Sequence, residues 1–541
     1  MKFQFLPLLL VVASASAQYS DHARLSQRLK FLESANSQNT KLTSLAKTAG
    51  GKDIWLLEVG SGDRTNHPAI VVIGGVEGSH LLGTELAVGF AEKLLAGANA
   101  DSVKALLATT TFYILPNVSP DATEQYFAKV KYERLGNAIV TDDDRDGKSN
   151  EDPFEDLNND GQITWIRIED QTGKWKPHPA DPRIMVMASA EKGEQGRYTL
   201  ISEGTDNDKD GKFNEDGEGG IHFNKSLTYD PPYFQAGAGE HPVSEIENRA
   251  VLDYLYERFN VFAVVTFGPV NNLSEPWKFD KSKNAGRVPG GIMENDAKQN
   301  KLASDLYKKS VKLKDAPAAA PQKGDVAQWA YFHYGRQSFS TPGWWAPKFE
   351  IPKDTTAAKK YKANDDKNTD VDFLRWAEKE NVDVFMPWTR TSHPDYPDMN
   401  AEVGGFKPFV RSNPPYNYVD KLATEHSKFI MTLGWKKPNV ELLNLKTEPL
   451  DGGVTRVTVT VQNTGLFPAV TDVAKNNNWV KLVKVTLVTD QQVVGGKKVT
   501  LLPNLEAGEA KTMSWLVKGK GKVTIEAGAP QTGVKQINVN Q

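Results

Sequence analysis

A glutamate and a histidine stand three residues apart at the end of an apolar run, where they could form half of a zinc site. In VVIGGVEGSHLLGTEL (residues 71–86), a β-branched run ends in Gly-Gly, and Glu77 and His80 follow just before a predicted helix. Carboxylate oxygens and imidazole nitrogens both bind zinc, but a catalytic zinc site usually has three protein ligands. The alternative is that Glu77 and His80 only pair with each other at the start of the helix.

Three short segments rich in Asp and Asn could bind a harder cation. DDDRDG (residues 142–147) and DNDKDG (residues 206–211) are each followed by Glu-Asp at the same distance, so they form an internal repeat. DLNNDG (residues 156–161) lies between them. Oxygen ligands at positions 1, 3 and 5, with glycine at position 6, are typical of calcium loops. The acid of EF-hand position 12 is replaced by Pro153 or Gly217.

We therefore predict structural calcium in this Asp-rich insertion (residues 141–220). The acids nearest to the missing position 12 are Asp152 and Asp216, one residue earlier. The alternative is a solvated acidic loop, because runs of like charge usually repel and stay open. The predicted calcium ligands are Asp142, Asp144, Asp146, Asp152, Asp156, Asn158, Asp160, Asp206, Asp208, Asp210 and Asp216.

Strands that alternate with helices must position Glu77 and His80. Apolar runs without alternation indicate buried parallel strands, and a period near that of the α-helix indicates helices. The expected strands cover residues 53–59, 69–75, 109–115 and 261–267, and the expected helices cover residues 21–49, 84–95, 242–256 and 422–432. This order predicts an α/β fold with a mixed, mostly parallel sheet flanked by helices. Ligands of such sheets bind at the carboxyl ends of the strands, where Glu77 and His80 stand.

The helical pattern stops after residue 437. Segments such as VTRVTVTVQN and KTMSWLV alternate apolar and polar residues, with turn-forming residues between the segments. This pattern predicts a C-terminal β-sandwich of the immunoglobulin or fibronectin type over residues 438–541. The sandwich carries no evident chemistry.

Composition narrows the classes of function. The 541 residues have a net charge of −3, which gives no general attraction to nucleic acid. The chain has no cysteine, and so neither disulfides nor thiolate metal sites. Residues 1–17 (MKFQFLPLLLVVASASA) have the pattern of a signal peptide, and their apolar run is shorter than the roughly 20 residues of a membrane span. We expect a secreted or periplasmic protein with no membrane span.

An ordered series of motifs extends the pattern around Glu77. GGVEGSHLLGTEL is followed by LPNVSPD, DDDRDG…DLNNDGQITWIR, HFNKS, TFGPVNNL, YGRQSF and EVGGFKPFVRSNPP. With these motifs the chain resembles the zinc carboxypeptidase (carboxypeptidase A-like) family, especially its large secreted bacterial branch, within a domain expected at residues 18–435. The resemblance implies zinc held by two His and one Glu, a separate Glu as general base, and arginines that hold a peptide's C-terminal carboxylate.

Several positions depart from the family's pattern. Its His-x-x-Glu zinc ligands correspond to Glu77 and His80, in reversed order, and its third ligand corresponds to Gly268. The general base corresponds to Pro342 or Gly343. Neither glycine nor proline offers a side-chain ligand or base, so the resemblance implies that hydrolysis is lost or strongly altered.

Other positions keep polar chemistry. Asn224 and Lys225 match the Asn-Arg pair that holds the substrate carboxylate, although lysine lacks the two-pronged grip of arginine. Arg134 matches another arginine of the family. The substitutes for the missing groups are Glu402 as general base, and His222 or His333 as third zinc ligand.

Three functions are compatible with this sequence. The preferred one is a non-hydrolytic protein that binds a peptide or cell-wall fragment through a free carboxylate and is stabilised by calcium. The second is an active zinc carboxypeptidase that uses Glu77, His80 and an unrecognised third ligand. The third is a purely structural or envelope-associated protein. Zinc analysis of the purified protein separates the first two, and the sequence does not define an oligomeric state.

Overall fold

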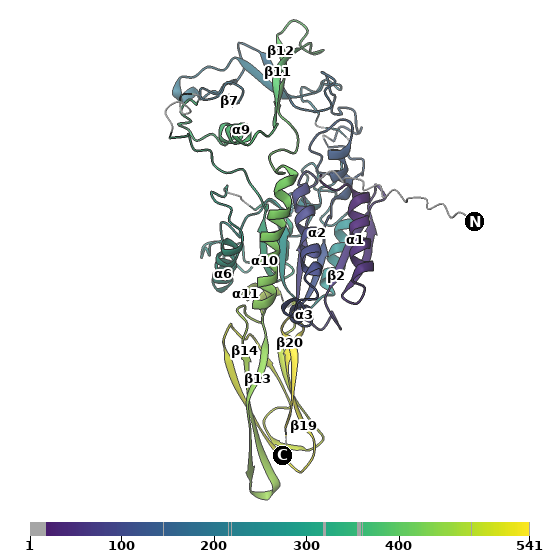
Figure 1. Ribbon diagram of the computed structural model, residues 1–541, viewed down its shortest axis with the longest axis vertical. Helices are drawn as coiled ribbons and strands as arrows, with labels where there is room; N and C mark the ends of the chain where they lie inside the picture. The colour runs from purple at the N-terminus through teal and green to yellow at the C-terminus, as the bar shows by residue number, and fades with distance from the viewer. Residues whose placement is uncertain are drawn as a thin grey trace, which may run out of the picture.

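The computed structural model describes residues 18–143, 145–214, 216–217, 219–317, 321–353, 359, 361–477 and 479–539. The predicted signal peptide, residues 1–17, therefore lies outside the described residues. Three parts built on β-sheets follow one another along the long axis of the molecule (Figure 1). None of the helices in the described ranges combines the length and the apolar character needed to cross a lipid bilayer.

The central sheet has six strands, and the predicted fold class is confirmed. Its spatial order is β1 (Thr40–Lys47), β2 (Asp53–Val59), β4 (Thr111–Leu115), β3 (Ala69–Ile73), β9 (Val261–Phe267) and β10 (Gln337–Thr341). The strands β4, β3, β9 and β10 pair in parallel, whereas β2 runs antiparallel to both β1 and β4. The apolar runs predicted as buried strands form β3 and β9, and every residue of both is buried.

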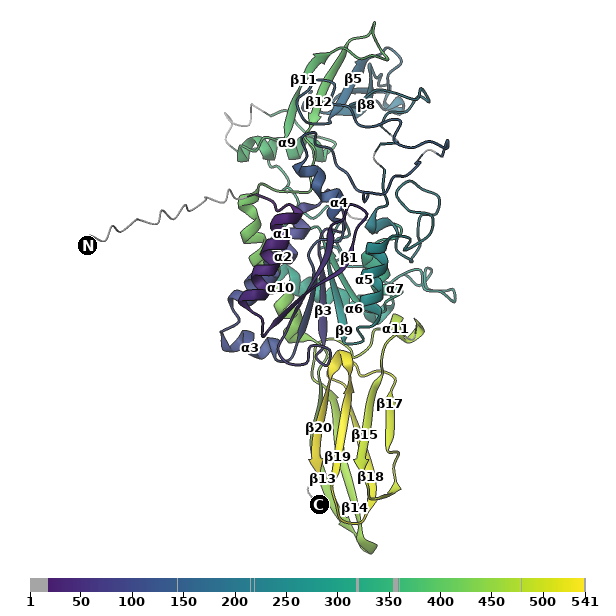
Figure 2. The same cartoon turned by 90° about the vertical axis from the view of Figure 1, so that its right-hand side faces the viewer.

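Helices cover both faces of the central sheet (Figure 2). The helices on one face are α1 (His22–Ala35), α2 (Leu81–Ala96), α3 (Asp101–Leu107), α6 (Glu294–Ser310) and α10 (Val419–Lys436). Those on the other face are α5 (Ile246–Tyr256) and α7 (Val326–Phe332). The short helix α4 (Pro120–Thr123) follows β4. Two apolar cores result, one on each side of the sheet, and the strand ends between them carry the candidate site.

One predicted helix is wrong in its extent. Residues 21–49 were expected to be helical throughout, but α1 ends at Ala35 and β1 occupies Thr40–Lys47. The sequence of β1, TKLTSLAK, has weak periodicity, and this strand forms because it pairs antiparallel with β2. Tertiary pairing of this kind overrides local helical preference.

A second six-stranded sheet lies above the central one in Figure 2. Its order is β11 (Phe385–Thr391), β12 (Ala401–Phe406), β5 (Trp165–Glu169), β8 (Tyr198–Ser202), β6 (Trp175–Pro177) and β7 (Met185–Met187). The Asp-rich insertion thus contributes β5 to β8, and β11 and β12 come from a segment about 200 residues later. The helix α9 (Thr369–Glu380) lies between this sheet and the central unit.

The C-terminal region forms two four-stranded sheets, as the alternating pattern predicts. One contains β13 (Val440–Leu450), β14 (Val454–Asn463), β18 (Ala510–Lys518) and β16 (Gln492–Gly495). The other contains β17 (Val499–Leu502), β15 (Val483–Thr489), β19 (Val523–Ala529) and β20 (Gly533–Val539). Both sheets contribute to one apolar core that includes Trp515, as a β-sandwich requires. The short helix α11 (Asp472–Asn477) packs against α6 and α7 of the central unit.

Candidate functional site

Glu77 lies just beyond the carboxyl end of β3. The strand leaves the sheet through Gly74 and Gly75, and a Cβ on Gly74 would lie 2.3 Å from the carbonyl oxygen of Gly83 in α2. The Glu77 Oε1 accepts a hydrogen bond of 2.7 Å from Nδ2 of Asn224. Burial raises the pKa of Glu77 to about 7, although the bond from Asn224 acts in the opposite direction. This carboxyl group therefore holds its proton far more tightly than an exposed glutamate does.

The predicted substrate-binding pair lies beside Glu77. Asn224 and Lys225 belong to the 3₁₀ helix η3 (Phe223–Lys225), and Asn224 is buried. The Asn224 Oδ1 accepts a 2.9 Å bond from the backbone N–H of Val326 at the start of α7, so this amide joins Glu77 to the helix. The half-buried Lys225 donates from Nζ to the carbonyl oxygen of Ala236 at 2.6 Å. Its positive charge lowers the pKa of Glu77, which places the ammonium group in electrostatic reach of that carboxyl.

The His80 side chain has a hydrogen-bond partner other than Glu77. Its Nε2 lies 2.9 Å from the carbonyl oxygen of Pro342, and its Nδ1 is buried with no hydrogen-bond partner in the described residues. A Cβ on Gly83 would lie 3.0 Å from that Nδ1, so the ring packs under the first turn of α2. Burial lowers the pKa of His80 to about 4 and keeps the ring neutral. The two side chains have different hydrogen-bond partners, and among the described residues no hydrogen bond or ion pair joins them.

Gly268, which the resemblance aligns with the family's third zinc ligand, has a neighbouring side chain in the space where its own Cβ would point. A Cβ on Gly268 would lie 2.6 Å from Cγ2 of Val76, closer than real Cβ contacts come. The proposed substitutes have other contacts. The His222 ring packs against Gly237, and Nδ1 of His333 is 2.7 Å from the hydroxyl of Thr228.

The described residues thus do not fit the zinc that the family resemblance implies. Within the described ranges, the one group of three or more His, Asp or Glu side chains close enough to share an ion is Asp206, Asp208 and Asp210. That group belongs to an Asp-rich loop and includes neither Glu77 nor His80. We therefore derive no reaction step through a zinc ion here.

Two other predicted site residues have different roles in the structure. Glu402 was expected near a strand end beside the site, but it lies in β12 of the second six-stranded sheet and forms a 2.7 Å ion pair with Arg167. The prediction that Glu402 replaces the general base is therefore corrected. The carboxylate of Glu402 pairs with Arg167 in a different sheet from the central one that carries Glu77. Arg134 donates to the carbonyl oxygens of Gly136 (3.1 Å) and Asn137 (2.6 Å), so its guanidinium braces the start of the insertion.

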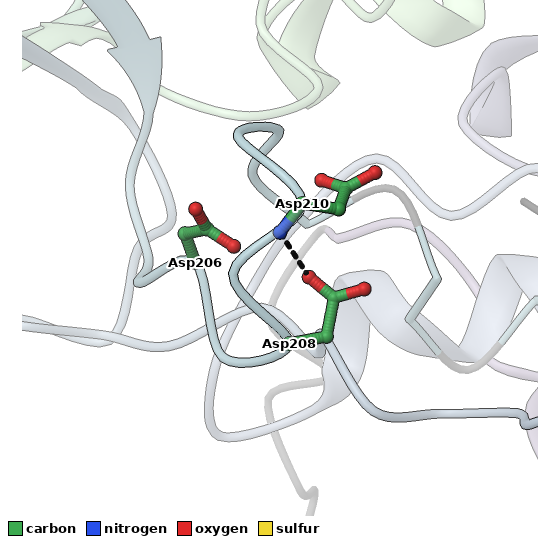
Figure 3. A group of neighbouring side chains, drawn as sticks. All are labelled: Asp206, Asp208 and Asp210. Atoms are coloured by element: carbon green, nitrogen blue, oxygen red, sulfur yellow. Dashed lines mark hydrogen bonds between the residues drawn. The ribbon is translucent and has the colours of Figure 1, made fainter.

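The two repeat loops have nearly the same backbone. Arg145 and Lys209, each fourth in its loop, have positive φ values of 69° and 68°. In both loops the first aspartate accepts a 3.0 Å bond from the N–H of the glycine at position 6, Asp142 from Gly147 and Asp206 from Gly211. The carboxylates of Asp206, Asp208 and Asp210 converge, with ligand atoms within 4.8 Å of one another (Figure 3). The predicted ligand Asp144 lies outside the described residues.

Each of the two repeat loops receives a buried acid from the other. Asp216 is 1% exposed, and its Oδ1 accepts a 3.0 Å bond from the N–H of Asp143, the second residue of the first loop. Asp152 is 0% exposed, and its Oδ1 accepts a 3.0 Å bond from the N–H of Asn207, the second residue of the second loop. The sequence prediction named both acids but did not predict this exchange between the loops.

The third loop receives its buried acid from a residue that sequence reasoning missed. Glu203 is 0% exposed, and its Oε1 accepts a 3.1 Å bond from the N–H of Leu157, again the second residue of a loop. Burial is the main cause that raises the pKa of Glu203, and the negative charges of Asp160 and Asp156 raise it further. This glutamate directly follows β8 (Tyr198–Ser202) and stands outside the three Asp-rich loops, so the spacing within the loops gives no signal for it.

Comparisons with known proteins agree with the central fold. The sequence model described as zinc carboxypeptidase matches residues 25–357, and one described as a domain of unknown function matches residues 439–540. Carboxypeptidase D of Anas platyrhynchos is 32% identical over 141 residues, 25% of this chain and 10% of that protein. Carboxypeptidase M of Mus musculus is 26% identical over 121 residues, 22% of this chain and 27% of that protein. This chain thus spans only a small part of these relatives.

Two solved structures are also similar to this chain. The carboxypeptidase A of Helicoverpa armigera is 11% identical with a TM-score of 0.42, and the match covers 77% of this chain and 73% of that one. The thrombin activatable fibrinolysis inhibitor is 11% identical with a TM-score of 0.42 and covers 78% of each chain. The match to the family's own sequence model covers more than half of the 541 residues. On that match, the chain belongs to the zinc carboxypeptidase family.

Proposed function

We propose that this family member binds, without hydrolysing, a peptide-like ligand that carries a free carboxylate. The observation that carries the proposal is the contact between Val76 and the position of the missing third ligand at Gly268. Glu77 and His80 add to it, because each has a partner of its own. A water molecule beside Glu77 lacks the ligand set that would lower its pKa.

The binding half of the proposal rests on Lys225 and Asn224. A half-buried ammonium group at the carboxyl ends of parallel strands is suited to an anionic ligand group. Asn224 holds Glu77 in place, and a protonated Glu77 would not repel a carboxylate. A protein C-terminus and a cell-wall peptide share this carboxylate chemistry, and parallel binding assays with each would distinguish them.

One set of measurements tests the proposal. The purified full chain is analysed for zinc, incubated with a peptide library to detect release of C-terminal residues, and titrated with the same peptides and with cell-wall fragments. We expect no tightly held zinc, no release, and binding that Lys225→Ala weakens. Lys484→Ala, an exposed lysine of β15, is the matched control. One zinc per chain together with C-terminal release would instead establish the second candidate function, an active carboxypeptidase.

That second candidate rests on family membership. Glu77 is a zinc ligand in it, so Glu77→Gln would lower the zinc content and abolish hydrolysis, if release is found.

We also propose that the three Asp-rich loops bind calcium in a structural role. Each loop has oxygen atoms at positions suited to a hard cation, and each is joined by a buried acid that has no ion-pair partner in the described part of the chain. A buried, uncompensated carboxylate is costly, and a divalent ion supplies the missing positive charge. Calorimetric titration of the chelator-treated protein with calcium tests this proposal.

A further inference from the structure

The second six-stranded sheet has one packed face and one open face. Side chains of β5 alternate between them: Ile166 and Ile168 are buried in a small apolar core with Val403 of β12, whereas Trp165 is 48% exposed. An antiparallel sheet with one solvated face normally carries polar residues on that face. A half-exposed tryptophan on the open face therefore departs from the usual pattern.

Other aromatic and apolar side chains gather around Trp165 and line a hollow of about 190 Å³ with it. These side chains, which make up the aromatic face, are Trp165, Trp175, Trp388, Phe385, Phe406 and Met185. Met187, the cross-strand partner of Trp175, continues the apolar surface and is 60% exposed. A contiguous exposed apolar surface of this kind, unlike single scattered residues, marks an interaction site.

The arginines around the aromatic face already have carboxylate partners. Each forms an ion pair of 2.5 to 2.7 Å: Arg411 with Asp370, Arg183 with Glu378, and Arg167 with Glu402. A phosphate or carboxylate ligand would have to displace one of these partners, and a quaternary ammonium ligand would meet the positive guanidinium groups. The charges of the hollow therefore favour a neutral ligand with both apolar and hydrogen-bonding surfaces.

We propose that the aromatic face binds a neutral saccharide, with a sugar ring stacked on Trp165. A pyranose ring has C–H bonds on its faces, which suit the electron-rich face of an indole, and hydroxyl groups at its edge, which suit the Arg411–Asp370 pair. A second hollow of about 470 Å³ adjoins the first at this pair, so an oligosaccharide can extend across both. Neither Glu77 nor Lys225 lines either hollow, so this site is independent of the proposed carboxylate binding.

Calorimetric titration of the full chain with cellohexaose, chitohexaose and maltohexaose tests the proposal. We expect at least one of these neutral sugars to bind, Trp165→Ala to weaken its binding about tenfold, and Trp165→Phe to keep most of the affinity. The matched control is Trp435→Ala, because Trp435, near the end of α10, is also 48% exposed. If Trp165→Ala does not fold, Trp175→Ala on the short strand β6 makes the same test.

Three results would overturn the saccharide site. They are no binding of any of the three sugars at millimolar concentration, wild-type affinity in Trp165→Ala, and binding of a single-stranded oligothymidylate in place of the sugars. Because the arginines are paired, we also expect sugar affinity to stay constant as salt rises from about 0.05 to 0.5 M, and a steep decline would contradict a neutral ligand. Lys225→Ala should bind the sugar as wild type does, so this proposal and the proposed function can fail separately.

Discussion

Cγ2 of Val76 lies 2.6 Å from the point where a Cβ on Gly268 would stand. The family resemblance implies that Gly268 corresponds to a zinc ligand, and on that correspondence the valine occupies the space that the ligand side chain would need. The contact between Val76 and Gly268 thus joins two changes: position 268 has no ligand side chain, and Val76 fills the space where one would lie. A change at Gly268 alone cannot restore the site unless Val76 also changes.

We predict that zinc binding returns only when this contact is relieved. Glu77→His, His80→Glu and Gly268→His restore the family's ligand types, but the new side chain at position 268 collides with Val76. Overpacking of this kind typically costs about 1–3 kcal/mol. Adding Val76→Ala should remove the strain and allow zinc uptake, measured as metal content after dialysis. If the triple variant binds zinc as well as the quadruple variant, Val76 is not the obstacle.

The pKa of Glu77 predicts a specific pH dependence of stability. Its folded-state pKa of about 7 lies above the ordinary value of 4.5, so between these pH values the folded chain holds a proton that the unfolded chain has released. The contribution of Glu77 to stability is therefore full below pH 4.5 and is lost as the pH rises to 7. The loss is about 1.4 kcal/mol for every tenfold difference in proton affinity between the folded and unfolded chains. Glu77→Gln keeps an acceptor for Asn224 and should remove this loss.

Denaturant unfolding of wild type and Glu77→Gln across this pH range makes the measurement. The two proteins are compared by the difference in their free energies of unfolding. Burial lowers the pKa of His80 in both, so its contribution to stability, which rises with pH, cancels in that difference. A difference that stays constant from pH 4.5 to 7 would show that Glu77 is ionised throughout.

Calcium should stabilise the insertion. A ligand that binds only the folded state at tenfold its Kd contributes about 1.4 kcal/mol per ion. Calcium loops of extracellular modules bind at roughly 10⁻⁴–10⁻³ M, so millimolar calcium suffices to show the effect. We expect a lower melting temperature in excess chelator than in calcium, measured by calorimetry. Equal melting temperatures would contradict structural calcium.

The sequence was sufficient for the parts of the fold whose signals are local. The runs that form β3 and β9 are apolar throughout and end in glycine, and the C-terminal strands alternate apolar and polar residues. Spacing alone also identified the Asp-rich loops. The extent of α1 was wrong because β1 is a strand only through its pairing with β2.

The site itself was less predictable, because its contacts join distant segments. Glu203 reaches Leu157 across 46 residues, and Asp216 reaches Asp143 across 73. Glu402 was expected near a strand end beside the site but lies in β12 of the second six-stranded sheet, since a strand's partners cannot be read from its own sequence. The repeat was the one available sign that the two loops belong together, and it did not show the crossing of their acids.

A last prediction concerns the attachment of the C-terminal sheets. Asp296 of α6 is buried; its Oδ1 accepts a 2.9 Å bond from the N–H of Asp472, and its Oδ2 accepts one of 2.6 Å from the Tyr331 hydroxyl and one of 3.1 Å from the N–H of Val473. One carboxylate thus caps the start of α11 from the central unit.

Asp296→Ala would leave buried donors at the start of α11 and the Tyr331 hydroxyl without an acceptor, at a cost of about 1–3 kcal/mol for each. We expect the C-terminal sheets to unfold separately in calorimetry and protease cleavage to increase near residue 437. The matched control is Asp305→Ala, an exposed aspartate on the same helix whose ion pair with Lys301 lies at the surface. A single unchanged transition in Asp296→Ala would mean that the apolar contacts of α11 hold the sheets in place without this carboxylate.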